Sequence, residues 1–135
     1  MTPEQKSLVR ESFAKITPIA PAAAAMFYDR LFELDPSLRP LFKGDMKEQA
    51  RKLIGVIVTA VANLDHFHEI APHVRELGAR HAGYGVKAAD YDTVANALLW
   101  ALEQGLGAGF TPAVKEAWIA CYGIIAGEMK EAAAA

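Results

Sequence analysis

Apolar residues recur at intervals of three and four along most of this chain, which is the spacing that places them on one face of an α-helix. Val9, Phe13 and Ile16 follow this spacing behind Thr2, whose hydroxyl fits an N-terminal cap. The pattern therefore predicts a first helix that ends near Pro18.

The next two helices are marked by their ends. One is expected from about residue 19 to residue 34, where the dipeptide Asp35-Pro36 stops it. The other begins after Asp45, which fits a cap, and it repeats apolar residues at helical spacing. Its inner face is apolar except for Gln49, which lies at its start.

The stretch from residue 65 to residue 73 is polar and contains a proline, so we expect it to form a loop. Its histidines are therefore expected to face solvent; they are His66, His68 and His73. A short helix then places Val74, Leu77 and His81 on one face, and Gly83 ends it. His81 is the polar member of that apolar face.

Two long helices complete the chain. Asp90 fits a cap for the first of them, and the glycine-rich segment GLGAGF ends it. Thr111-Pro112 starts the last helix. Since no segment alternates apolar and polar residues with the period of a β-strand, we expect an all-α fold with roughly six to eight helices.

Length and composition fit one globular domain over residues 1–135. The formal net charge of −2 gives no general attraction for nucleic acid. Cys121 is the only cysteine, so a disulfide within the chain and a thiolate metal cluster are excluded. The N-terminus lacks the pattern of a secretory signal, and no apolar run approaches the roughly 20 residues that span a bilayer. We therefore expect a cytoplasmic protein without a membrane anchor.

The imidazole of His81 has two interpretations. On an apolar helix face it is more often a core histidine with satisfied hydrogen bonds than a ligand. Tyr28, in the aromatic cluster MFYDRLF, and Gln49 favour the second interpretation. An inward imidazole, phenol and amide in an all-α chain would suit an iron porphyrin, with the imidazole on one side of the metal and hydrogen-bond donors on the other.

Five motifs, in this order and at these separations, resemble those of bacterial globins. They are FYDRLFELDP, LFKGD, QARKL, LGARHAGYGV and AWIACYG. The resemblance covers almost the whole chain, and it points to the single-domain haemoglobins that are similar to the globin domain of flavohaemoglobins. It implies a globin fold that encloses one haem b, iron protoporphyrin IX.

Carried over residue by residue, the resemblance implies a role for each matching position. His81 would be the proximal ligand of the iron, and Phe42 would pack against the porphyrin. Tyr28, Gln49 and Leu53 would form the distal pocket. The other positions implied to contact the haem are Leu77, Val86, Lys52 and Arg80, of which the last two would point outward near the propionates.

Tyr91 matches the tyrosine that in flavohaemoglobins reaches toward the proximal histidine. That pattern includes a glutamate late in the last helix, and the matching position here is Ala133. Glu131 lies two residues earlier, which on a helix is a rotation of about 200° and turns it away. The sequence therefore departs from the flavohaemoglobin pattern at this carboxylate, on which oxygen binding does not depend.

The resemblance implies reversible, high-affinity binding of dioxygen and of other diatomic gases, CO and NO. The nearest alternative is a nitric oxide dioxygenase that works with a separate reductase, since 135 residues leave no room for a flavin or nicotinamide domain. A haem sensor would need an output domain. In a helical interaction module without a cofactor, the placement of Tyr28, Gln49 and His81 would be a coincidence. Oxygen binding is the function that we expect.

Overall fold

Six α-helices and three short 3-10 helices make up the secondary structure of residues 1–134, which are the part of the chain that this computed structural model describes. In chain order they are α1 (Pro3–Ile16), η1 (Thr17–Ile19), α2 (Ala20–Leu34), η2 (Pro36–Leu41), α3 (Met46–Ala62), α4 (Phe67–Gly83), α5 (Asp90–Leu106), η3 (Gly107–Gly109) and α6 (Pro112–Ala134). The prediction of an all-α fold is confirmed. No helix within the described residues is long and apolar enough to cross a membrane.

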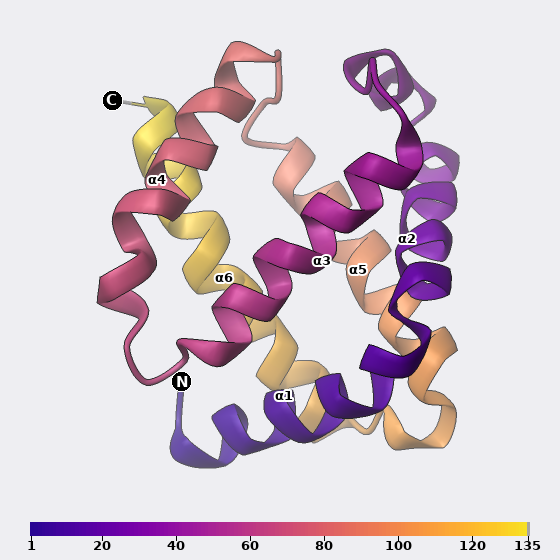
Figure 1. Cartoon of the computed structure of the whole chain (residues 1–135), viewed down its shortest axis with the longest axis vertical. Helices are drawn as coiled ribbons and strands as arrows, with labels where there is room; N and C mark the ends of the chain where they lie inside the picture. The colour runs from indigo at the N-terminus through magenta and orange to yellow at the C-terminus, as the bar shows by residue number, and fades with distance from the viewer. Residues whose placement is uncertain (135) are drawn as a thin grey trace.

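The helices pack in pairs around the core. α4 lies beside α6 and α2 lies beside α5, while α1 crosses the lower end of α6 and α3 runs diagonally in front, between α2 and α4 (Figure 1). The largest cluster of buried side chains lies where α1 meets α6, and it includes Val9, Ile16 and Trp118. The indole N–H of Trp118 donates a hydrogen bond to the Ser12 hydroxyl at 2.9 Å, so the polar atoms of this core are paired.

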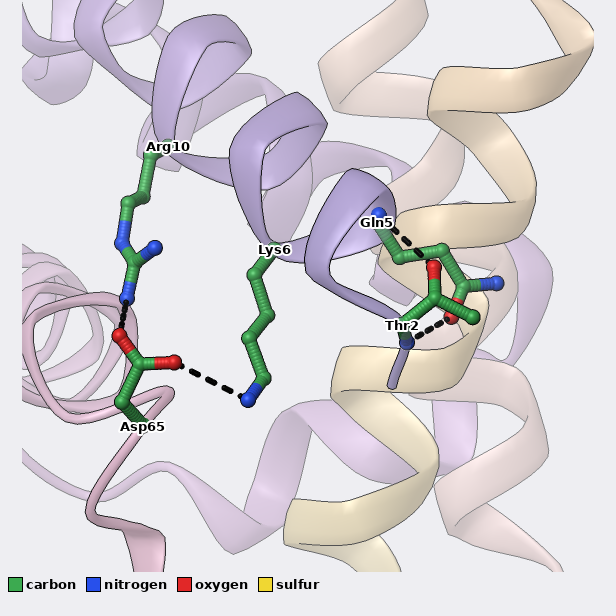
Figure 2. A network of polar contacts seen from close by, with 5 residues as sticks. All are labelled: Thr2, Gln5, Lys6, Arg10 and Asp65. Atoms are coloured by element: carbon green, nitrogen blue, oxygen red, sulfur yellow. Dashed lines mark hydrogen bonds and ion pairs between the residues drawn. The ribbon is translucent and has the colours of Figure 1, made fainter.

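The start of α1 is fixed by a reciprocal pair of hydrogen bonds. The Thr2 hydroxyl accepts a hydrogen bond from the Gln5 backbone N–H at 3.1 Å, and the Gln5 side-chain carbonyl accepts one from the Thr2 N–H at 3.0 Å (Figure 2). Backbone donors that a helix start would leave without partners are satisfied in this way. The cap predicted at Thr2 is confirmed.

Asp65 ties α1 to the turn between α3 and α4. Its carboxylate oxygens each accept one hydrogen bond, from Lys6 Nζ at 3.0 Å and from Arg10 Nη2 at 2.7 Å (Figure 2). Lys6 and Arg10 are four residues apart, so they lie on the same face of α1. Their hydrogen bonds hold the pKa of Asp65 below its usual range. The segment that leads into α4 is thereby held against the first helix.

The crossing of α4 over α6 depends on Gly78. A Cβ atom at this buried position would overlap the backbone of Met129 on α6, so only glycine permits this approach. His81 lies three residues later on α4. The contact between the two backbones therefore sets the position of the helix turn that carries His81.

The structure corrects the predicted start of the helix that carries His81. α4 begins at Phe67, so His68, Pro72 and His73 lie within the helix and not in a loop. The side chains of His68 and His73 point to solvent, as expected, and polar residues on the outer face of a helix gave the segment its loop-like composition. Pro72 lies in the second turn, where the helix loses one backbone hydrogen bond and continues.

The predicted cap of α5 is also wrong by one residue. Asp90 is the first residue of the helix, and Ala89 takes the cap position. The Asp90 carboxylate accepts a hydrogen bond from the Lys87 backbone N–H at 2.8 Å, three residues back and outside the helix. The acidic side chain still stabilises the helix start, because its charge opposes the positive end of the helix dipole.

Candidate functional site

His81 lies in the last turn of α4 and is half-buried. Its Nδ1 atom lies 2.7 Å from the carbonyl oxygen of Leu77, one turn earlier. Since a carbonyl oxygen only accepts hydrogen bonds, Nδ1 is the donor, and in the neutral ring Nε2 carries the lone pair. No residue from 1 to 134 makes a hydrogen bond to Nε2. The ring is thus fixed in orientation and offers one free ligand atom.

The chain reverses direction directly after His81. α4 ends at Gly83, and Gly85 has a φ of +96°, in the left-handed region that favours glycine. This reversal lets the His81 carbonyl accept a hydrogen bond from the Val86 N–H at 3.1 Å. Val86 and Leu77 are both half-buried and border the same apolar cluster. The structure therefore brings Leu77, His81 and Val86 together.

Tyr91 is buried at the start of α5, in the cluster that Leu77 and Val86 border. Its hydroxyl makes no hydrogen bond with any residue from 1 to 134, and burial raises its pKa. Its backbone carbonyl, by contrast, accepts a hydrogen bond from the Tyr122 hydroxyl at 2.7 Å. Tyr91 is therefore held by its backbone, while its side chain keeps an unused buried donor.

Tyr28 is buried in α2, on the opposite side of the candidate site. Its hydroxyl donates a hydrogen bond to the backbone carbonyl of Gln49, in the first turn of α3, at 3.4 Å. Burial raises the pKa of Tyr28 to about 12, although a hydrogen bond with the Gln49 side chain partly offsets the effect. The phenol therefore stays protonated at neutral pH and remains a donor. Tyr28 meets the backbone of Gln49, whose side chain is half-buried.

Three phenylalanine rings surround Tyr28. The ring of Phe27 meets it edge-on with centroids 4.9 Å apart, and the ring of Phe42 does so at 5.5 Å. Phe32 stacks on it at 6.1 Å and also contacts Phe42 at 5.3 Å. Such pairs stabilise a defined ring orientation. The cluster therefore links the position of the Tyr28 phenol to that of Phe42, which lies between η2 and α3.

An apolar cavity of about 40 Å³ lies beside Leu53, among α1, α2, α3 and α5. Its wall also includes Phe13, Ala24, Phe27, Ile57 and Ala101. Trp118 also lines the cavity, and its indole N–H donates to Ser12. A cavity with apolar walls stays dry, so this space is suited to small apolar molecules.

Comparison with known proteins settles the family. The Globin family model matches residues 25–129 of the chain. The chain is a globin. It is 29% identical to the neuroglobin of Danio rerio over 143 aligned residues, which cover 96% of this chain and 90% of that protein. It is 36% identical over 103 residues to the flavohemoprotein of Bacillus subtilis, and the match covers 74% of this globin but 26% of that protein.

Solved structures share this globin's fold. An engineered carbene transferase from Rhodothermus marinus has a TM-score of 0.90 at 26% identity, over 99% of this chain and 94% of that one. A bacterial globin from Campylobacter jejuni has a TM-score of 0.84 at 25% identity, over 97% and 95%. A hexacoordinated heme protein from a tardigrade, at 16% identity and a TM-score of 0.90, has the same fold. The predicted resemblance to bacterial globins is confirmed.

The residues around His81 of this globin fit an iron porphyrin. Within residues 1–134 no three His, Cys, Asp or Glu side chains gather as a metal site. A porphyrin would supply iron ligands of its own, so one imidazole from the protein would suffice to hold it. A macrocycle needs apolar contacts on both faces. Phe42 and Leu53 are half-buried beside the cluster that contains Tyr28, and Leu77 and Val86 are half-buried beside the cluster that contains Tyr91.

The charged residues of the predicted site lie at the surface of the globin. Lys52 and Arg80 are both exposed. The Arg80 guanidinium lies 3.5 Å from the Glu76 carboxylate, in a solvated pair that contributes little to stability. Arg80 therefore loses little if it turns toward another anion.

Glu131 is directed away from Tyr91. α6 continues as a helix to Ala134, and the Glu131 carboxylate lies 3.3 Å from Arg75 of α4. Glu128 shares the same guanidinium at 3.2 Å. This position agrees with the rotation expected from the sequence, so Glu131 does not supply a carboxylate beside Tyr91.

Two residues that shape the site were not singled out from the sequence. Gly78 lies inside a helix, where glycine costs stability relative to alanine, and such a glycine is a signal of close packing. Arg39 donates a hydrogen bond from its guanidinium to the Phe42 carbonyl. Its position three residues before Phe42 is visible in the sequence, but the contact depends on the 3-10 turn that joins them.

Proposed function

We propose that this globin holds haem b through Nε2 of His81 and binds dioxygen reversibly on the side of Tyr28. The observation that carries the proposal is the hydrogen bond from His81 Nδ1 to the Leu77 carbonyl, because it leaves Nε2 as the unprotonated ring nitrogen. Membership of the globin family supports it. When bound, haem would supply an iron that takes a diatomic gas as an exchangeable ligand.

In this proposal the apolar residues hold the porphyrin and keep water out. Phe42 and Leu53 lie on the side of Tyr28, whereas Leu77 and Val86 lie on the side of His81. Lys52 and Arg80 are exposed, so they are suited to pair with the carboxylates at the edge of the macrocycle. These are the positions that the resemblance implied.

Tyr28 would give the site its preference for oxygen. Its neutral phenol has one O–H, which would leave its long 3.4 Å contact with the Gln49 carbonyl and donate to a polar gas ligand instead. A hydrogen bond to a partly charged acceptor stabilises it by about 1.5–3 kcal/mol. That energy slows release by roughly ten- to hundredfold. CO is less polar, so the same hydrogen bond would stabilise it less. The half-buried amide of Gln49 would be a second donor.

The direct test is haem titration of His81→Ala beside His73→Ala, a matched control because His73 is exposed on the same helix. We expect the control to bind one haem and to form a reversible oxygen complex with the spectrum of the unmodified protein. His81→Ala should lose haem or bind it at least tenfold more weakly. Retention of haem and of the ferrous spectrum in His81→Ala would show that the ligand lies elsewhere.

A second candidate function is nitric oxide dioxygenation with an external reductase. It is favoured by the similarity to the Rhodothermus marinus protein, which is named as a candidate nitric oxide dioxygenase, and to the flavohemoprotein. Each turnover would leave ferric iron, and the electrons would have to come from outside the globin fold. Nitric oxide consumption with NADH alone should stop after one equivalent and become catalytic when a flavin reductase is added. Sustained turnover without reductase would contradict this requirement.

A further inference from the structure

Arg39 holds both backbone groups of Phe42. Its own carbonyl accepts a hydrogen bond from the Phe42 N–H at 3.1 Å, which is the last 3-10 contact of η2. Its guanidinium Nη1 donates to the Phe42 carbonyl at 2.9 Å. Phe42 itself has extended backbone, and the three residues after it are not helical. These two contacts are therefore the restraints on the Phe42 backbone.

The same guanidinium lies over an aromatic ring. The Arg39 Cζ atom is 5.4 Å from the centroid of Phe32, within the range of a cation–π contact. Phe32 in turn contacts both Phe42 and Tyr28. Arg39 thus contacts the ring of Phe32 and the backbone of Phe42, although its own side chain is exposed.

We propose that Arg39 is a positioning residue, which fixes the Phe42 ring and, through Phe42 and Phe32, the direction of the Tyr28 hydroxyl. Burial alone does not fix Phe42, because that side chain is half-buried. A site residue of this kind needs support from outside the pocket to keep one orientation. The effect of Arg39 on gas release rests on the function proposed above, whereas its effect on Phe42 does not.

The chemistry requires arginine at this position. A planar guanidinium can lie flat on Phe32 and at the same time donate in its plane to the Phe42 carbonyl. The ammonium of lysine is a point charge, and it cannot make both contacts with the same geometry. Arg39→Lys is therefore an informative conservative variant, and Arg39→Leu removes both contacts.

The chain contains a matched control. Arg30 of α2 also lies over an aromatic ring, Trp100, at 5.4 Å, and it pairs with Glu33. Arg30→Leu therefore removes one half-buried guanidinium, one ion pair and one cation–π contact, but no hydrogen bond to Phe42. A general loss of stability should affect both leucine variants alike.

The first measurement is amide hydrogen exchange at Phe42 by NMR, together with cross-peaks between the Phe42 and Tyr28 rings, on the protein as purified. In Arg39→Leu we expect exchange at least about fivefold faster than in Arg30→Leu, and weaker cross-peaks. Arg39→Lys should recover less than half of this loss. Unchanged exchange and cross-peaks in Arg39→Leu would overturn the proposal whether or not haem is present. The proposal would also fail if Arg39→Lys had the exchange rate and cross-peaks of the unmodified protein.

The second measurement is the stretching band of CO and the dissociation rate of oxygen in the haem-loaded variants. Arg39→Leu should broaden or split the CO band and speed oxygen release about threefold, whereas Arg30→Leu should match the unmodified protein. A sharp band and an unchanged rate, with Phe42 loosened, would overturn the link from Phe42 to Tyr28. If no variant takes up haem, the proposed function fails, and the exchange measurement still decides the role of Arg39.

Discussion

Gly78 of α4 and Met129 of α6 meet through their backbones, with no space for a side chain between them. We predict that Gly78→Ala destabilises the protein by about 1–3 kcal/mol, as overpacking does in a close-packed core. The higher helix propensity of alanine, worth about 1 kcal/mol, offsets only part of this cost. Because His81 lies one turn later, haem affinity should fall as well. Chemical unfolding and haem titration measure the two effects.

Gly55→Ala is the control for this prediction. Gly55 lies in the middle of α3, and a Cβ atom there would meet no atom within 4 Å. The same substitution should therefore stabilise the protein by about 0.5–1 kcal/mol. If both variants gain stability, α4 and α6 can separate without cost, and the position of His81 does not depend on this contact.

Replacement of Tyr28 by phenylalanine should speed oxygen dissociation about tenfold or more and change CO dissociation less, because the more polar ligand loses a stronger hydrogen bond. Gln49→Leu should act in the same direction but more weakly, since it removes the amide and keeps the carbonyl that contacts Tyr28. Stopped-flow ligand displacement is the measurement. Tyr84→Phe, at a residue that is 62% exposed, is the control. Equal oxygen rates in Tyr28→Phe and this control would mean that the phenol does not face the ligand.

Two tyrosines of the cluster beside α4 should respond in opposite ways to the loss of a hydroxyl. Tyr122→Phe removes a 2.7 Å hydrogen bond to the Tyr91 carbonyl and should cost about 1–2 kcal/mol of unfolding free energy. Tyr91→Phe removes a buried hydroxyl without a partner among residues 1–134, so it should be neutral or stabilising. Denaturant unfolding of both variants checks the difference. A large loss in Tyr91→Phe would reveal a partner for its hydroxyl in the loaded protein.

The ion pairs of Asp65 should make stability depend on pH in the acid range. Their hydrogen bonds lower the pKa of Asp65 in the folded state below the unfolded value of about 3.9. The ion pairs of Asp65 therefore contribute to the free energy of unfolding above about pH 4, and this contribution is lost as the pH falls through the folded-state pKa. Asp65→Asn should lower the thermal midpoint at pH 7, and the difference from the unmodified protein should shrink toward pH 3.

Glu48→Gln is the comparison for Asp65→Asn. Glu48 pairs with Arg51 within α3, and both side chains are more than half exposed. We expect no measurable change of the thermal midpoint at any pH, because exposed pairs of this kind contribute little. If Asp65→Asn lowers the thermal midpoint by the same amount from pH 7 to pH 3, the charge of Asp65 is not the cause of the difference.

The elements that the sequence predicted well are those whose signals are local. The cap at Thr2 and the helical spacing of Val9 and Ile16 involve residues within a few turns of each other, and the structure contains both. The start of α4 was missed because Pro72 and the neighbouring histidines have the composition of a loop. Packing against α6 overrides that composition, and a single sequence does not display it.

The residues of the candidate site also divide into those that local sequence patterns indicated and those whose contacts depend on the tertiary structure. The position of His81 on an apolar face followed from periodicity, and Tyr28 was singled out from its aromatic cluster, whereas their suggested roles came from the resemblance and remain predictions. The contact between Gly78 and Met129, 51 residues apart, could not be predicted, because it depends on how two helices cross. Arg39 is exposed and lies on no periodic face, so its contact with Phe42 became visible only in three dimensions.

The cavity beside Leu53 gives the folded chain a volume that disappears when it unfolds. Water enters such a space as the structure opens, the system contracts, and hydrostatic pressure therefore favours the unfolded state. Ala24 and Ala101 are two of the small side chains that line this space. A larger side chain at either position would make the globin less compressible and more resistant to pressure, and the same change would leave less room for a dissolved gas to dwell inside the protein.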